Sequence, residues 1–182
     1  MDSQSGHLLD NNIISILLRP TDPLHGRIRA RFETLKPGVK VFLPVIAIAE
    51  IESGMAKAVN IDPDQRDALR KFFRDHPLHR GIDDDTVEPY ALIRGQIWRD
   101  YATPKPSGRG HIEKLPEELL ERVSGKSLGI DERDLLIAAT AAQYQFILIT
   151  NDSNEGMKRI KLAAEKLEAD GKPVRLRIDF WP

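Results

Sequence analysis

Cysteine is absent from this 182-residue sequence. Its absence excludes disulfide bonds, a thiolate nucleophile, and zinc or iron–sulfur sites with cysteine ligands. A chain of this length can bury roughly 70% of the surface that it exposes when unfolded, so it needs no covalent cross-link to fold. We therefore expect a single domain spanning residues 1–182 that is stable in a reducing compartment.

Long apolar runs are also missing. No stretch approaches the ~18–20 residues that a membrane-spanning helix requires. The first ten residues, MDSQSGHLLD, lack the basic start and apolar core of a signal peptide. We expect a cytoplasmic protein with no membrane partner.

An excess of one charge is missing as well, because 27 basic residues balance 28 acidic ones and the net charge is −1. The chain as a whole does not attract nucleic acid, so such a partner would need locally clustered basic residues. The glycine-rich phosphate loops, the serine elbow of hydrolases and paired histidines at metal-ligand spacing are absent too. These absences leave no warrant for nucleotide binding, serine catalysis or a histidine-ligated metal.

Short apolar runs alternate with helical periodicity along the chain, which is typical of an α/β fold with a mainly parallel sheet. A loop rich in proline, glycine and basic residues, 103–114, lies in a predicted loop/helix insertion at about 100–128. The pattern predicts strands at 7–9, 39–43, 146–149 and 174–178, with a further short strand in 77–83. It predicts helices at 13–19, 24–35, 45–60, 63–76, 87–101, 116–123, 132–144 and 154–169.

Two acids follow predicted strands. Asp10 comes directly after the first strand, and Asp152 comes three residues after the strand that ends at Ile149. The carboxyl ends of parallel strands meet at one edge of a sheet, where open α/β folds bind their ligands. We therefore expect these two side chains to face the same edge.

Two further acids interrupt apolar helices. Glu50 lies within VIAIAEI, and Asp134 precedes LLIAATAA. Each taken alone has a structural alternative, either a helix start or an ion pair, but an unpartnered carboxylate there would be costly. Together with Asp10 and Asp152 they predict a carboxylate cluster that needs a cation, and hard oxygen ligands suit Mg²⁺ or Mn²⁺. Whether one ion or two would bind stays open.

Four segments carry a resemblance to the PIN-domain nuclease family, and most closely to its VapC-type toxins. They are LLDNNIIS (8–15), VFLPVIAIAEIESG (41–54), DLLIAATA (134–141) and ILITND (147–152), in the order and at the separations of that family. The resemblance implies a three-layer α/β/α sandwich and Mg²⁺- or Mn²⁺-dependent cleavage of RNA phosphodiester bonds. It also implies a cytoplasmic homodimer bound by a small antitoxin protein.

The resemblance places the four catalytic, metal-binding acids at Asp10, Glu50, Asp134 and Asp152. Asn12 and Thr150 match positions where the family carries supporting polar groups. The chain departs from the family after Asp152, where it reads SNEGMKRI instead of a second aspartate followed by phenylalanine, and in its longer 100–128 segment.

Several alternatives stay open. Asp131 is interpreted as a helix N-cap, with a place in the metal shell as the alternative. Lys105, Arg109 and Lys114, together with His111, are candidate RNA contacts, against an exposed insertion without a role. The whole chain could instead be a non-catalytic metal- or partner-binding module of the same fold, or a nuclease acting on DNA.

Overall fold

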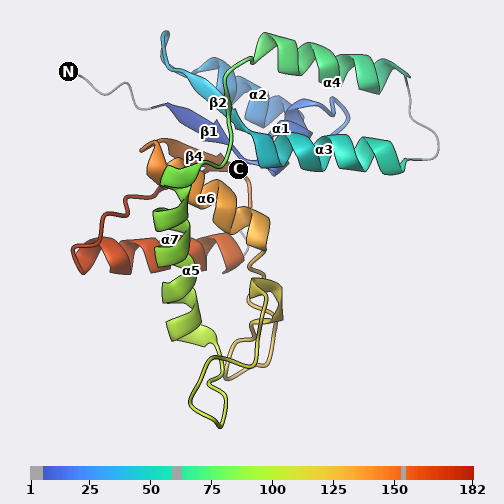
Figure 1. Cartoon of the computed structure of the whole chain (residues 1–182). Helices are drawn as coiled ribbons and strands as arrows, with labels where there is room; N and C mark the ends of the chain where they lie inside the picture. The colour runs from blue at the N-terminus through green and yellow to red at the C-terminus, as the bar shows by residue number, and fades with distance from the viewer. Residues whose placement is uncertain (1–5, 59–62, 153–154) are drawn as a thin grey trace. The chain divides into compact units, whose positions relative to one another are not determined.

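The computed structural model describes residues 6–58, 63–152 and 155–182, which contain five strands and seven α-helices (Figure 1). The chain divides into two compact units. The first contains the described residues up to 81 together with 145–152 and 178–182. The second contains 82–144 and 155–177. Within the described ranges, no helix combines the length and the apolar character needed to cross a bilayer.

The first unit is built on a five-stranded sheet in the order β3-β2-β1-β4-β5. Its central strand, β1, runs parallel to both β2 and β4, with His7 in register with Val41 and Ile147. β2 is also parallel to β3. The ends of β1 and β4 therefore lie at the same edge of the sheet. The strands are β1 His7–Leu9, β2 Val41–Pro44, β3 His79–Arg80, β4 Ile147–Thr150 and β5 Arg177–Phe180.

Apolar residues in the central strands form the core of this unit. Leu8, Leu9 and Leu148 are fully buried, and the rings of Phe42 and Phe146 stack with their centroids 4.3 Å apart. Burial on both faces explains why these strands read as continuous apolar runs instead of alternating ones. The helices of the unit are α1 Asn11–Leu17, α2 His25–Glu33, α3 Val45–Lys57 and α4 Pro63–Asp75.

The second unit is helical. α5 (Val87–Tyr101) contacts both α6 (Glu132–Gln143) and α7 (Glu155–Ala169), and a short 3-10 helix, Asp84–Thr86, precedes α5. Small residues allow close approach here: a Cβ atom added at Gly156 would collide with the backbone carbonyl of Gly129. The first turn of α7 therefore crosses directly over the chain that leads into α6.

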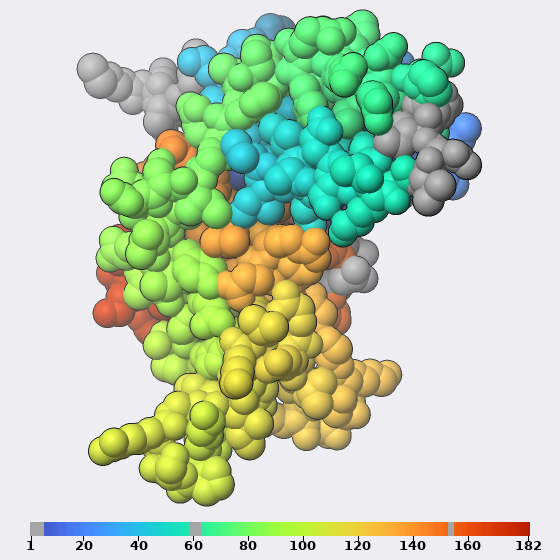
Figure 2. Space-filling view, turned by 45° about the vertical axis from the view of Figure 1, so that its right-hand side comes forward, coloured from blue at the N-terminus to red at the C-terminus, as the bar shows by residue number. Residues whose placement is uncertain are grey.

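Residues 103–128, which we call the arm, join α5 to α6 through two hairpins. In the first, Ile112 N–H donates to the Thr103 carbonyl at 2.9 Å. In the second, Leu128 N–H donates to the Leu119 carbonyl at 3.0 Å, and both of these leucines are fully buried. A single 3-10 turn, Pro116–Glu118, lies between the hairpins. Figure 2 shows the arm as the yellow and gold segment.

The sequence prediction of an α/β fold with a mainly parallel sheet is confirmed, and so is a short strand in 77–83, but several bounds differ. The predicted helix 116–123 is wrong, because Leu119 and Leu128 bury themselves across a hairpin. The last strand is β5, instead of 174–178, and the second begins at Val41. The predicted helix end at Asn60 and helix start at Asn154 lie outside the described residues.

Candidate active site

Asp10 lies where β1 ends and α1 begins, and only 3% of it is exposed. Its Oδ1 accepts a hydrogen bond from the Asn11 N–H at 2.7 Å, and its Oδ2 accepts one from the Thr150 hydroxyl at 2.7 Å. Asp10 therefore caps α1. Burial raises the pKa of Asp10, the two hydrogen bonds oppose that shift, and the negative charges of Asp152 and Glu50 add to it.

Thr150, the last residue of β4, joins the ends of the two central strands. Its hydroxyl donates to Asp10, and accepts from the Asn12 side-chain amide at 3.1 Å and from the Asp152 N–H at 2.9 Å. A hydroxyl has one proton and two lone pairs, so these three bonds satisfy it fully. Asn12 is held in turn, because its Oδ1 accepts from the Asn151 N–H at 3.0 Å. The buried Thr150 and the half-buried Asn12 thus fix the geometry around Asp10.

Glu50 reaches this edge of the sheet from α3. Its Oε2 accepts a hydrogen bond from the Asn11 side chain at 3.1 Å, and the residue is half-buried. Asn11 is the contact that sequence reasoning missed, because its partner Glu50 lies 39 positions away along the chain. Its position next to Asp10 and Asn12 was the signal available.

Asp152 is half-buried and lies two residues beyond β4, close enough for its charge to act on Asp10. Three predicted acids of the first unit, Asp10, Glu50 and Asp152, are thus electrostatically coupled. In residues 6–58, 63–152 and 155–182, no three Asp, Glu or His side chains form a group that could hold a metal ion by themselves.

Asp134 belongs to the second unit, where it is half-buried in the first turn of α6. Its proximity to the other three acids stays a prediction. The interpretation of Asp131 as the N-cap of α6 is confirmed, because its Oδ1 accepts from the Arg133 N–H at 2.8 Å. Asp131 also pairs with the Arg133 side chain, which lowers the pKa of the Asp131 carboxyl.

The candidate RNA contacts Lys105, Arg109 and Lys114 are all exposed and all lie in the arm of the second unit. The structure holds their backbone in place, with Lys105 N–H donating to the Gly110 carbonyl at 3.0 Å and the Lys114 carbonyl accepting from Arg94 at 3.0 Å.

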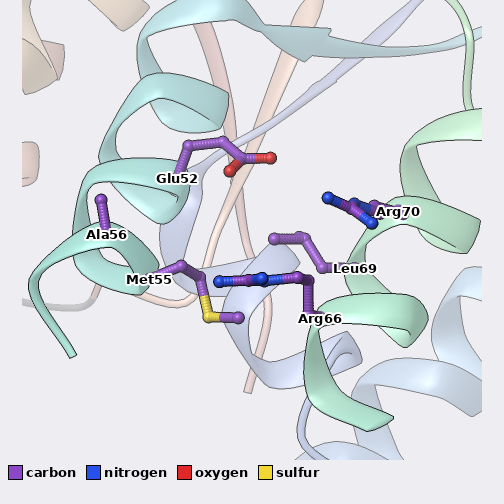
Figure 3. A pocket seen from close by; sticks show the side chains of 6 residues that line it. All are labelled: Glu52, Met55, Ala56, Arg66, Leu69 and Arg70. Carbon is purple, nitrogen blue, oxygen red and sulfur yellow. The ribbon is translucent and has the colours of Figure 1, made fainter. Parts of the chain in front are cut away.

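A separate cavity of about 330 Å³ lies between α3 and α4 (Figure 3). Glu52 lines it from one side, and Arg66 and Arg70 line it from the other, over a floor that includes Leu69. Glu52 is exposed, and its side chain faces this cavity. Nothing in the cavity resembles the acid-rich edge around Asp10.

Solved structures of similar fold come from bacterial two-protein complexes. The chain is similar to one in VapBC2 from Rickettsia felis bound to a promoter DNA fragment (16% identity, 97% of this chain and 98% of that chain covered, TM-score 0.62). It is similar to a chain of VapBC-1 from nontypeable Haemophilus influenzae (18% identity, 96% of this chain and 97% of that chain covered, TM-score 0.61). It is also similar to a chain of FitAcB from Neisseria gonorrhoeae (23% identity, 85% of this chain and 93% of that chain covered, TM-score 0.56). These identities establish the fold alone. Among curated proteins no sequence matches.

The family match spans most of the chain. It covers residues 7–162, and so includes all four predicted acids and the whole arm. The fold it shows is the three-layer α/β/α sandwich expected from the sequence resemblance. The chain therefore belongs to the PIN domain family.

Proposed function

We propose that this protein is a divalent-metal-dependent endoribonuclease, and that it is the toxin of a type II toxin–antitoxin pair. PIN domains are generally nucleases, and they typically use divalent metal ions. The observation that carries the proposal is the arrangement around Asp10: a buried carboxylate, held by the Thr150 hydroxyl and raised in pKa by burial and by the charges of Asp152 and Glu50.

The donor set fits Mg²⁺ or Mn²⁺. Carboxylate oxygens are the ligands that these hard cations prefer, and a cation there would offset the cost of ionising buried, mutually repelling acids. Mg²⁺ usually binds one or two carboxylates and keeps several waters, so a closed cage of three acids is not required. We assign the metal-binding role to Asp10, Glu50, Asp134 and Asp152.

The residues of the chain would act mainly by position and charge. A bound divalent ion supplies Lewis acidity and makes water more acidic. The Thr150 hydroxyl and the Asn12 amide keep Asp10 and the Asp152 backbone in one orientation, and Asn11 orients Glu50. Such a preorganised set of charges favours in-line displacement at phosphorus, with no covalent intermediate on the protein.

The partner proposal draws on the similar complexes, three of which are described as bound to DNA: VapBC2 with a promoter fragment, FitAB with the IR36 fragment, and VapBC from Salmonella typhimurium. For this chain we propose a small antitoxin partner, a homodimeric state and a cytoplasmic location. Gene order offers a direct check. A short upstream reading frame that overlaps this one and encodes a DNA-binding protein supports the pairing, and an isolated gene contradicts it.

The activity is tested with end-labelled single-stranded RNA and DNA of the same sequence, incubated with Mg²⁺, with Mn²⁺ or with EDTA. We expect cleavage of RNA that needs a divalent ion and that Asp10→Asn reduces by at least about 10³-fold, as removal of a key charged group typically does. Cleavage that persists in EDTA or in Asp10→Asn contradicts the proposal. Cleavage of DNA alone makes the enzyme a deoxyribonuclease, and metal binding without any cleavage makes it a non-catalytic module.

A further inference from the structure

The two hairpins of the arm end in matching sequences. The first tip reads KPSGR (105–109) and the second RVSGK (122–126), so each contains a cation, any residue, Ser-Gly and a second cation. The two tips hold four basic residues and no acidic one. The match is apparent only in the structure, because the sequence alone predicted a loop for the first segment and part of a helix for the second.

The glycines allow both tips to turn. Gly108 has φ +69° and donates its N–H to the Lys105 carbonyl at 2.9 Å. Gly125 has φ +66° and donates to the Glu121 carbonyl at 2.8 Å, while Glu121 N–H donates to the Lys126 carbonyl at 2.8 Å. Positive φ costs little only for glycine, so the two turns depend on these residues. Each turn leaves one cation on either side of its Ser-Gly pair.

The acids of the arm are used to hold its own backbone. Glu113 accepts from the Thr103 N–H at 2.8 Å, and Glu118 accepts from the Lys114 N–H at 2.6 Å. Glu117 accepts from the Glu132 N–H at 3.0 Å, and Glu121 accepts from Ser124. All four carboxylates therefore have structural partners within the second unit.

The cations of the two tips differ from these acids, because they lack ion-pair partners among the described residues. Lys105, Arg109, Arg122 and Lys126 are all exposed, and in the part of the chain that the structure describes none of them forms an ion pair. Several other exposed cations of the same unit are paired: Lys158 with Glu155, Lys166 with Asp100 and Arg175 with Glu168. Each tip thus presents two exposed cations and no acidic side chain among its five residues.

Exposed apolar side chains accompany the cations, and Val123 on the second tip is 93% exposed. Exposed apolar side chains by themselves would be equally consistent with docking of another protein. The charge favours a different partner, because phosphate groups are bound in proteins by exposed Arg and Lys side chains, and both tips present these cations. Two separate turns that each carry two cations match the repeated phosphates of a nucleic-acid backbone better than a single small anion.

We propose that the two tips, 105–109 and 122–126, bind the phosphate backbone of the RNA substrate. The contact reads no base, so it sets the affinity for RNA and not the rate of the chemical step. The inference rests on the proposed function only in taking RNA as the nucleic acid. It extends the candidate contacts of the first tip to a second tip.

Binding is measured apart from cleavage. Asp10→Asn protein in EDTA is titrated against a fluorescent single-stranded RNA of about 30 nucleotides, over a range of salt concentrations. The tip variant carries Lys105→Gln, Arg109→Gln, Arg122→Gln and Lys126→Gln. Its matched control carries Lys158→Gln, Lys166→Gln, Lys172→Gln and Arg175→Gln, which removes the same charge from exposed positions of the same unit. Circular dichroism melting confirms that both variants fold.

We expect the tip variant to bind RNA at least about 10-fold more weakly, while the control changes less than about 3-fold. The slope of log affinity against log salt should fall by about 3 for the tip variant, because each lost phosphate contact contributes about 0.7. Equal weakening in the control, unchanged affinity in the tip variant, or no RNA binding by the parent protein would overturn the inference. Cleavage of RNA by the wild-type protein is measured in a separate assay. The tip proposal can therefore fail while the proposed function holds, and the proposed function can fail while the tip proposal holds.

Discussion

The acids around Asp10 and the cations of the arm use charge in opposite ways. The acids lie at a sheet edge, buried or half-buried, coupled to one another and oriented by Thr150, Asn12 and Asn11. The cations lie on two exposed turns and make no ion pair in the described residues. Gathering like charges in a buried place is costly unless a cation compensates, whereas cations in water cost little. From this difference we propose that the sheet edge is preorganised for chemistry and that the arm binds a long anion.

The largest effect is expected at Asp134, which we propose to join the acids of the first unit. Asp134→Asn should reduce metal-dependent RNA cleavage by at least about 10³-fold, as Asp10→Asn does. Asp131→Asn serves as the control. Asparagine also caps helices well, and Asp131 is bound to the start of α6, so its cleavage rate should stay within a few-fold of wild type. Equal losses in both variants would remove the distinction between a metal ligand and a cap.

A smaller effect is expected at Thr150. Thr150→Val removes the hydroxyl that orients Asp10, and loss of such a supporting hydrogen bond typically costs about 10–100-fold in activity. Thr140→Val is the matched control, because Thr140 is equally buried but its hydroxyl bonds the Leu136 carbonyl within α6. Steady-state cleavage at saturating RNA should separate the two. An unaffected rate in Thr150→Val would show that the sheet edge is not preorganised through this hydroxyl.

The smallest effect is on stability. The raised pKa of Asp10 means that the folded protein holds this proton more tightly than the unfolded chain does. Metal-free protein therefore loses stability as pH rises from the unfolded pKa through the folded pKa, because the buried carboxyl ionises. Asp10→Asn should remove this loss, so in EDTA its Tm at about pH 8 should equal or exceed that of wild type. Suppose instead that the Tm of Asp10→Asn is below that of wild type at about pH 8, and that the variant gains no stability relative to wild type between about pH 4 and pH 8. The acids would then tolerate ionisation without a cation.

Much of the sheet edge could be predicted from the sequence, because parallel strands bring their carboxyl ends together whatever lies between them. That rule placed Asp10 and Asp152 at one edge, and the family resemblance added Asn12 and Thr150. Asn11 was missed, because its contact to Glu50 spans 39 positions and no local pattern encodes it.

The arm was harder to predict, because its structure depends on tertiary burial. The apolar and acidic residues of 116–123 resemble a helix, but the burial of Leu119 against a partner beyond Gly125 converts them into one side of a hairpin. Without that hairpin there was no reason to align two five-residue stretches. The distance of Asp134 from the other three acids likewise could not be predicted from the spacing of residues along the chain.

The crossing of Gly129 and Gly156 has a consequence for how such proteins can diverge. Since the first turn of α7 presses on the chain just before α6, the point where the arm rejoins the helical bundle is anchored. Hairpins upstream of that anchor can lengthen, shorten or change sequence while the helix that carries Asp134 keeps its place. Nucleic-acid preference could then evolve by loop exchange alone, with the hydrolytic apparatus inherited intact.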